Sequence, residues 1–325
     1  MSSACGSRDG ASPASVAAGP TATLASDATG QIAFMRGDPS EGVLAGEGVT
    51  YTVNADGSNL QQLFSAGPSA GPLWSPDGAE IHIFCCGDGM AAHFVDPQTG
   101  ELRTLPPPDP TLEAYCGGAW SPDGERLTCE AFGVDDPSRN GIYTIRASDG
   151  GGISRITSNP GGEDIPGDYA PDGDRLVFVR STEDGEVGVF VADVDGGHSR
   201  EISPPDVMVD EIFGGSWSPT GDTILFVARE SEDHHKAIWI VHADGSSPTR
   251  LSIADGCGGP LADPASFGCY WPDWSPDGTR IVFTRSAPDG SQENLWVVNA
   301  DGSGLTQLTD GGTDDQADWG PAPPG

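Results

Sequence analysis

The sequence predicts an all-β protein, a six-bladed β-propeller built from four-stranded antiparallel blades. A short motif recurs six times, strand-like apolar runs follow each copy, and no window keeps helical spacing of apolar residues over three turns. The motif joins an aromatic residue to Ser, Pro, Asp and Gly, and it recurs at intervals of 45 to 57 residues. A period of that size indicates a solenoid, a propeller or an array. The six aromatics are Trp74, Trp120, Tyr169, Trp217, Trp274 and Trp319.

Each repeat has the same internal order of elements. The aromatic phrase is followed by an apolar run such as residues 281–283, then a polar loop, a second apolar run such as residues 294–299, and a short piece such as residues 305–309. Runs of four to six residues rich in Val, Ile, Phe, Trp and Tyr, bounded by Gly, Asp, Asn and Pro, are strand signals. Each repeat is therefore expected to contain four strands.

The turns support the same prediction. In SPDG, Pro presets the dihedral angle of a type I turn and Gly supplies the positive φ at its exit. Asp-Gly pairs between apolar runs, as at residues 244–245 and 301–302, indicate tight hairpins. Four-stranded units of this kind bury both faces when they stack around an axis, and the repeated aromatic would fill the gap between neighbouring blades.

The chain enters the repeat late, at residue 30, and ends with the aromatic strand alone at residues 318–321. The C-terminal strand is therefore expected to pair into the first blade and close the ring, which removes an exposed sheet edge. On this interpretation residues 30–321 form one propeller domain. Residues 1–29 are a flexible linker rich in Ala, Ser, Gly and Pro, and residues 322–325 are a tail.

These residues carry a resemblance to a known family. WSPDG followed by IVFTR, NLWVVNADGSG and LTQLT resembles the TolB-like family of WD-repeat-like propellers, over about residues 30–321. Two copies depart from the pattern, with Tyr169-Ala170 in place of Trp-Ser and Thr220 in place of Asp. The resemblance implies a propeller with a protein or peptide partner. It says little about chemistry.

The composition is strongly acidic, with a formal net charge of -34 from 49 acidic and 15 basic residues. Such a field repels nucleic acid and attracts cations and basic partners. We therefore expect no nucleic-acid role. Surface acid that only keeps a Gly-rich β protein soluble is the alternative explanation.

The sequence predicts a location outside the cytoplasm, in a bacterial cell envelope or secreted. There is no run of eighteen apolar residues, so no membrane span is expected, and no intact signal peptide is present. Residues 2–5 resemble the end of a lipoprotein box, which makes Cys5 a candidate for lipidation and residues 1–29 a candidate tether. The propeller is expected to be a monomer.

Seven cysteines fit an oxidising compartment. Cys257 and Cys269 bracket the longest insertion, and a bridge there would contribute roughly 3 kcal/mol by loop entropy. Cys116 and Cys129 would be near neighbours across one hairpin, and Cys85 or Cys86 could reach the adjacent blade. Three pairings of these four are possible, and buried free thiols are the alternative.

Function is predicted on the face that carries the variable loops, because loops that vary on a rigid scaffold are where binding is normally placed. Several acids just before the inner strands could converge on the channel mouth and hold a hard cation such as calcium, or a basic side chain. Solvated loop acids are the alternative. The six candidates are Glu163, Asp164, Asp210, Glu211, Asp314 and Asp315.

Other polar residues are given smaller roles. Asp168, Asp273 and Asp318 directly precede motif aromatics and are expected to bond backbone within their own motif. His234 and His235 are interpreted as a solvated loop tip rather than as metal ligands. No cofactor is assigned.

Two functional classes remain. The first is a non-catalytic interaction module, secreted or lipid-anchored, that binds a protein or peptide through its loop-rich face and channel mouth. The second is a metal-dependent hydrolase, lactonase or lyase with a cation in the central channel. No GxSxG, GxxxxGK[ST] or HExxH motif occurs, so no catalytic residue is assigned.

Overall fold

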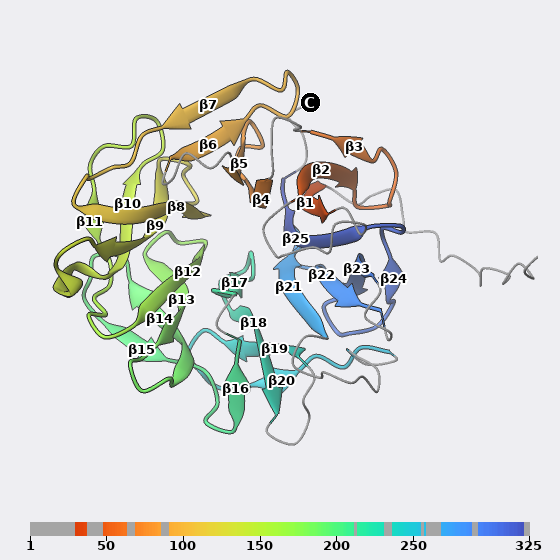
Figure 1. Cartoon of the computed structure of the whole chain (residues 1–325). Helices are drawn as coiled ribbons and strands as arrows, with labels where there is room; N and C mark the ends of the chain where they lie inside the picture. The colour runs from red at the N-terminus through yellow and green to blue at the C-terminus, as the bar shows by residue number, and fades with distance from the viewer. Residues whose placement is uncertain are drawn as a thin grey trace, which may run out of the picture.

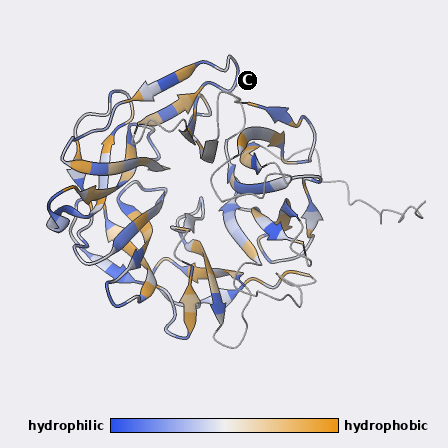
Figure 2. Ribbon diagram, in the orientation of Figure 1, coloured by the Kyte–Doolittle hydropathy of each residue, from blue (hydrophilic) through white to orange (hydrophobic). Residues whose placement is uncertain are grey.

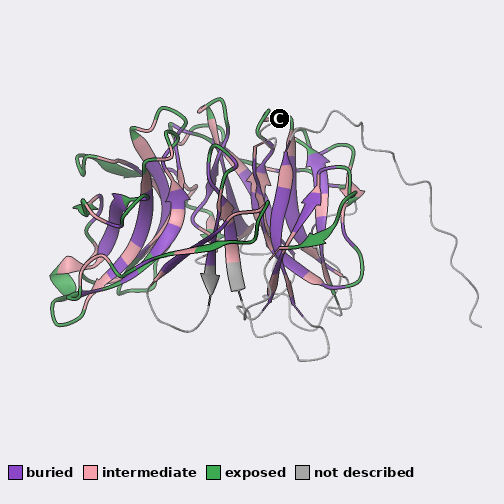
Figure 3. Ribbon diagram, turned by 90° about the horizontal axis from the view of Figure 1, so that it is seen from above, coloured by how far each residue is buried: buried purple, intermediate pink, exposed green. Residues whose placement is uncertain are grey.

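The computed structural model describes residues 30–37, 48–63, 69–85, 91–210, 213–230, 236–254, 257, 268–287 and 292–321. Within these ranges the protein consists of β-strands and one 3₁₀ turn, Pro137–Arg139, with no α-helix. The predicted all-β class is confirmed. Figure 1 shows the sheets arranged around a central axis, and Figure 3 shows their buried strands standing side by side with the exposed turns at their ends.

Three of the sheets are four-stranded and antiparallel, and their strands follow one another in chain order or its reverse. In each, the strand that ends on the motif aromatic lies nearest the axis (Figure 1). These sheets contain β4 (Ser69–Trp74), β5 (Ile81–Cys85), β6 (Ala92–Val95) and β7 (Leu102–Leu105), then β8 (Leu112–Trp120), β9 (Arg126–Gly133), β10 (Gly141–Arg146) and β11 (Ser154–Arg155), then β12 (Glu163–Tyr169), β13 (Arg175–Ser181), β14 (Val187–Asp193) and β15 (Ser199–Glu201).

The next sheet has a divided inner strand. Two short strands, β16 (Val207–Val209) and β17 (Ser216–Trp217), both pair with β18 (Thr223–Glu230), which continues to β19 (Ala237–His242) and β20 (Thr249–Arg250). Four strands were expected in each repeat, and the division of the inner strand gives this sheet five. Gly214 and Gly215, directly before β17, allow a close backbone approach to the neighbouring inner strand.

The remaining strands form one eight-stranded sheet in which the first and the last strand of the described chain pair. β25 pairs antiparallel with β1, from Ile32 opposite Trp319 to Gly37 opposite Thr313. A single parallel bridge between Glu293 and Thr313 joins β25 to β23 and so connects the two halves of this sheet. The strands are β21 (Cys269–Trp274), β22 (Arg280–Ser286), β23 (Glu293–Asn299), β24 (Thr306–Gln307), β25 (Thr313–Trp319), β1 (Gln31–Gly37), β2 (Val49–Asn54) and β3 (Gln61–Gln62).

The core lies between neighbouring sheets, and the motif aromatics occupy it. Trp217 packs with Val177 of the preceding sheet, Trp274 with Leu225, and Trp319 with Val282. Apolar residues alternate with polar ones along many strands (Figure 2), because successive side chains point to opposite faces. Burial of these large rings against the neighbouring sheet stabilises the packing of one sheet on another.

The SPDG turn that follows each aromatic explains the other motif residues. Ser75 donates its hydroxyl to Asp77 at 2.7 Å, and the Gly78 N–H donates to the Ser75 carbonyl at 2.9 Å. The same hydroxyl-to-carboxylate bond recurs from Ser121 and Ser275, at 2.6 Å in both. Gly78 adopts φ +69°, which glycine reaches without strain. These three motifs therefore satisfy their own turns.

Candidate functional site: the axial cavity

A cavity of about 300 Å³ lies on the axis, and every inner strand contributes to its wall. The lining comes mostly from the three residues before each motif aromatic, for example Gly71, Pro72 and Leu73 in β4. Because inner strands run in the same direction from the loop-rich end to the SPDG turns, equivalent positions form layers across the channel.

The layer three residues before the aromatic has an unusual backbone. The strand register shifts at this position in β4, β8, β21 and β25, which marks a β-bulge. The bulge residues adopt positive φ, at +54° for Gly71 and +119° for Gly117. Trp271 and Gln316 adopt the same region, at +52° and +53°, although side chains disfavour it.

Aromatic side chains line one part of the cavity. Trp271 meets Phe213 edge to face, with ring centroids 5.9 Å apart and an interplanar angle of 82°. Phe213 comes from the segment that separates β16 from β17. Gln316 is used differently, since its Oε1 accepts a hydrogen bond from the Gly71 N–H at 2.5 Å.

Three carboxylates occupy the layer one residue before the aromatic. Asp168, Asp273 and Asp318 all line the cavity. Each accepts a backbone N–H bond from the motif aromatic of the following inner strand: Trp217 to Asp168 at 3.0 Å, Trp319 to Asp273 at 2.7 Å, and Trp74 to Asp318 at 2.8 Å.

The expectation that these aspartates bond within their own motif is therefore wrong for Asp168 and Asp318. Asp273 does both, because it also accepts from the Trp274 N–H at 2.9 Å and from the Ser216 hydroxyl at 2.8 Å. The physical reason is that the nearby backbone amides are already bonded, Ala170 N–H to the Arg175 carbonyl at 2.8 Å and Gly320 N–H to the Gln31 carbonyl at 2.9 Å. The aspartate before the aromatic is left to bridge one sheet to the next.

The titratable side chains of the cavity wall include four carboxyl groups, whose pKa values are raised. Burial raises the pKa of Asp168 to about 7, with Asp273 adding repulsion, and burial raises the pKa of Asp273 to about 6. Burial and then repulsion from Asp273 hold the pKa of Asp318 well above its usual range. Glu130 also lines the cavity, and burial raises its pKa to about 7. No Lys, Arg or His is among the described lining residues.

Of the six acids that the sequence placed at the channel mouth, the five that the structure describes lie outside this cavity, and three of these form ion pairs. Asp164 is buried and binds Arg180 through two bonds of 2.7 Å, and Asp314 is buried and binds Arg36 at 2.5 and 2.7 Å. Asp210 pairs with Lys236 at 2.6 Å. These contacts join the inner strand to its own sheet.

The other three candidates differ from one another. Glu163 is exposed, and Glu211 lies outside the described residues. Asp315 is 6 % exposed, its Oδ1 has no hydrogen-bond partner among the described residues, and burial raises its pKa to about 8 with help from Glu293 and Asp314. Among the described candidates, Asp164, Asp210 and Asp314 are therefore each engaged by a basic partner within their own sheet.

The comparisons place the chain in a family. Residues 46–265 match the family model of the TolB β-propeller domain. The chain belongs to this family. An uncharacterized protein of Agrobacterium fabrum is 30% identical over 228 residues, which cover 66% of this chain and 69% of the relative. A Tol-Pal system protein TolB of Anaeromyxobacter dehalogenans is 30% identical over 148 residues, which cover 44% of this chain and 28% of that protein.

Solved structures agree on the fold. TolB from Acinetobacter baumannii superposes with a TM-score of 0.69 at 21% identity, covering 91% of this chain and 67% of that one. An oligogalacturonate lyase in complex with manganese gives 0.54 at 15% identity, covering 81% and 70%. At such identities the likeness shows the TolB-type fold alone. The resemblance predicted from the repeats is confirmed.

A metal centre was the second expectation for a propeller of this type. Across the described ranges, no three His, Cys, Asp or Glu side chains are grouped so that they could hold a metal ion. His234 and His235 lie outside those ranges. We therefore derive no metal-assisted reaction from the described residues.

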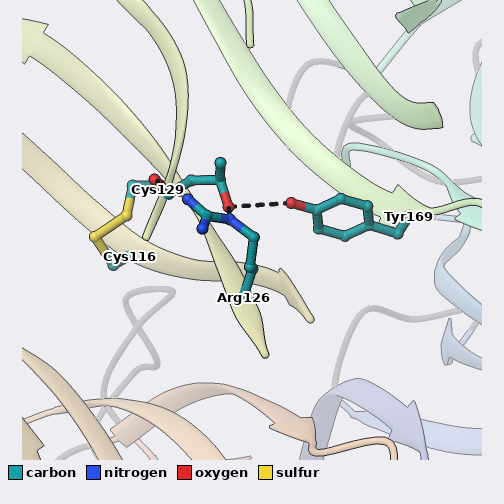
Figure 4. The surroundings of a disulfide bond; sticks show 5 residues. Cys116, Arg126, Cys129 and Tyr169 are labelled. Carbon is teal, nitrogen blue, oxygen red and sulfur yellow. Dashed lines mark hydrogen bonds between the residues drawn. A yellow bond between two sulfur atoms is a disulfide. The ribbon is translucent and has the colours of Figure 1, made fainter. Parts of the chain in front are cut away.

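Two disulfides lie among the described residues. Cys116 joins Cys129 between the directly paired strands β8 and β9, close to the hydrogen bond from the Tyr169 hydroxyl to Thr144 (Figure 4). Cys257 joins Cys269 with 5.1 Å between their Cα atoms. Cys5, Cys86 and the side chain of Cys85 lie outside the described part of the structure.

Sequence reasoning missed the aromatic and acidic wall of the cavity. A signal was available: when the motif copies are aligned, the third residue before the aromatic is Gly71, Gly117, Pro166, Gly214, Trp271 and Gln316. Glycine in three copies indicates a conformation that disfavours side chains. A tryptophan at such a position marks a candidate functional residue.

Proposed function

We propose that this protein is a non-catalytic binding propeller that works outside the cytoplasm and takes a peptide segment of a partner protein into its axial cavity. The observation that carries the proposal is a cavity built by all the inner strands, with an aromatic pair and three carboxylates facing it. Concave sites with apolar walls and a few placed polar groups are where proteins normally bind ligands.

The proposal includes the architecture that would support such a site. We take residues 30–321 as one six-bladed propeller, closed by β25 pairing with β1. Support comes from that pairing and from the aspartates, which connect β12 to β17, β21 to β25 and β25 to β4. A closed ring holds the cavity wall rigid, so little entropy is lost on binding.

The size of the cavity limits what enters it. About 300 Å³ is at the lower end of ligand pockets, roughly 300–1,000 Å³, so one or two side chains fit rather than a folded element. The rest of the partner segment would lie on the loop-rich face. The expected partner is a protein or peptide, and the negative field disfavours nucleic acid.

The proposed location rests on separate observations. Two disulfides are expected in oxidising compartments, and relatives include proteins of the Tol-Pal system. No helix in the described part of the chain is long and apolar enough to cross a membrane. We propose that residues 1–29 act as a tether, with Cys5 as the lipidated residue, and that the propeller works as a monomer.

The experiment that tests the function selects linear peptides from a random display library against the purified protein. Their affinities are then measured by calorimetry. Leu73 lines the cavity from β4, so Leu73→Trp would fill it. Leu60 is 45% exposed at a hairpin, and Leu60→Trp is the matched control. We expect Leu73→Trp to abolish binding and Leu60→Trp to leave it unchanged. Peptides that bind both variants equally would contradict the proposal.

A further inference from the structure

We propose that the axial cavity recognises a cationic side chain of the bound peptide, and that arginine is the side chain it fits. This inference rests on the proposed function, because it specifies the chemistry of the segment that enters the cavity.

The first argument is the conformation of Trp271. Its backbone adopts φ +52°, where Gly71 stands at the equivalent position of β4. A residue with a side chain costs about 1–3 kcal/mol in such a conformation, and strained residues of this kind cluster at ligand sites. The ring is placed in the cavity wall, edge to face with Phe213. A ligand contact would explain why tryptophan stands where glycine is the easier residue.

The second argument is charge. Asp168, Asp273 and Asp318 face the cavity, and its described lining contains no basic residue. The whole chain has a net charge of -34. The hydrogen bonds that these carboxylates accept come from neutral N–H and O–H groups, so no positive charge offsets them when they are ionised. In a low-dielectric site such carboxylates attract a cation more strongly than they would in water. The site is therefore complementary to positive charge.

The third argument is the relative position of the two features. Asp273 follows Trp271 by two residues, so the carboxylate layer lies about 6 Å further along the inner strands than the aromatic layer. An arginine side chain has an apolar stem and a planar cation at its tip, and it stacks on aromatic faces. Its stem would contact Trp271 and Phe213 while the guanidinium reaches the aspartates.

The carboxylates also make binding dependent on pH. The pKa values of Asp168 and Asp273 are raised to about 7 and about 6, so part of this pair is protonated near neutral pH. A bound cation favours the ionised carboxylates and releases protons. The described titratable groups facing this space are the three aspartates, Glu130 and Tyr115. Binding should therefore tighten as pH rises from 6 to 8.

The test uses the whole chain and the capped peptide acetyl-Gly-Arg-Gly-amide, measured by calorimetry at low salt. The same peptide with citrulline is the neutral control. We expect the arginine peptide to bind at least about tenfold more tightly, from the cation–π and charge contributions together. Its affinity should rise about tenfold between pH 6 and pH 8, with proton release seen in buffers of different ionisation enthalpy.

Variants separate recognition from folding. Trp271→Gly should weaken the arginine peptide about tenfold without lowering the melting temperature, because glycine accepts the positive φ. In Asp168→Asn the amide oxygen can still accept the Trp217 N–H, and binding should fall about threefold or more. Asp301→Asn, in an exposed hairpin, is the matched control for charge and should bind like the wild type.

Equal affinities for the arginine and citrulline peptides would overturn the inference. So would free arginine or spermidine binding as tightly as the capped peptide, because the site would then take small cations rather than a peptide side chain. Library peptides that are blocked by Leu73→Trp but lack Arg would overturn this inference and leave the proposed function intact. If Leu73→Trp blocks no peptide, the proposed function itself fails.

Discussion

The inner strands on two sides of the axial channel place different residues in the same left-handed backbone conformation. In β4 and β8 the bulge residue is Gly71 or Gly117, and in β21 and β25 it is Trp271 or Gln316. All four adopt positive φ, unlike Pro166 and Gly214 at the same position of the other two inner strands, and only β21 and β25 place side chains in this conformation. The Gln316 side chain bonds the Gly71 N–H, whereas the Trp271 ring contacts Phe213 across the cavity wall.

The comparison shows which inner-strand positions carry backbone strain. Glycine adopts the left-handed conformation without strain. At Gly117 the space that a Cβ would need is occupied by the His82 ring. On the other side the strain is tolerated because the side chain is used, for a structural bond at Gln316 and, on our proposal, for a ligand at Trp271. Four substitutions test this comparison.

The largest effect is expected for Gly117→Ala. Gly117 has φ +119°, and its Cβ would lie 2.0 Å from the His82 ring, so strain and overpacking add to about 4 kcal/mol of lost stability. Denaturant unfolding measures the loss. Gly124→Ala is the control, with φ +71° but open space around its Cβ, and it should lose about 1 kcal/mol. Equal losses would show that the His82 contact does not matter.

The next effect is at Asp315, beside Gln316 on the side that carries side chains. Its buried carboxyl has a pKa of about 8 when folded, against an ordinary value of 3.8, so its contribution to stability is complete below pH 4 and is lost as pH rises through 8. Asp315→Asn should stabilise the fold by about 2 kcal/mol at pH 8 and by little at pH 4. Melting temperatures across pH check this, and a gain independent of pH would contradict it.

A smaller effect is expected for Gln316→Gly. Glycine relieves the strain at φ +53°, but the bond to the Gly71 N–H is lost and leaves a partly buried donor without its partner. The two contributions leave a net loss of about 1 kcal/mol in denaturant unfolding. A net gain would show that Gln316, like Trp271, is not retained for stability.

The smallest effect is expected for Trp271→Gly. Relief of strain offsets the lost contact with Phe213, and stability should stay within about 1 kcal/mol of the wild type. Trp274→Gly, three residues further along β21, removes a ring that is 7% exposed in the core and should cost about 3–5 kcal/mol. Similar losses for both tryptophans would make Trp271 a structural residue and remove the basis of the comparison.

The strands and turns could be predicted because their signals are local. SPDG fixes its own turn through bonds such as Ser75 to Asp77, and the alternating apolar runs fix which face is buried. The acids before the inner strands could not be placed, because their partners are remote in sequence: Arg36 lies 278 residues before Asp314. The cavity could not be predicted for a related reason. Its wall combines a few residues from each of the inner strands, which lie far apart in sequence.

The aspartate bridges also impose an order on biosynthesis. Each one bonds the aromatic strand that follows it around the axis, so Asp168 finds its partner only after residue 217 has been made. The amide of Trp74, near the beginning of the chain, waits for Asp318, near its end. A nascent chain therefore lacks this bond to β4 until residue 318 has been made, and products truncated before that residue cannot form it.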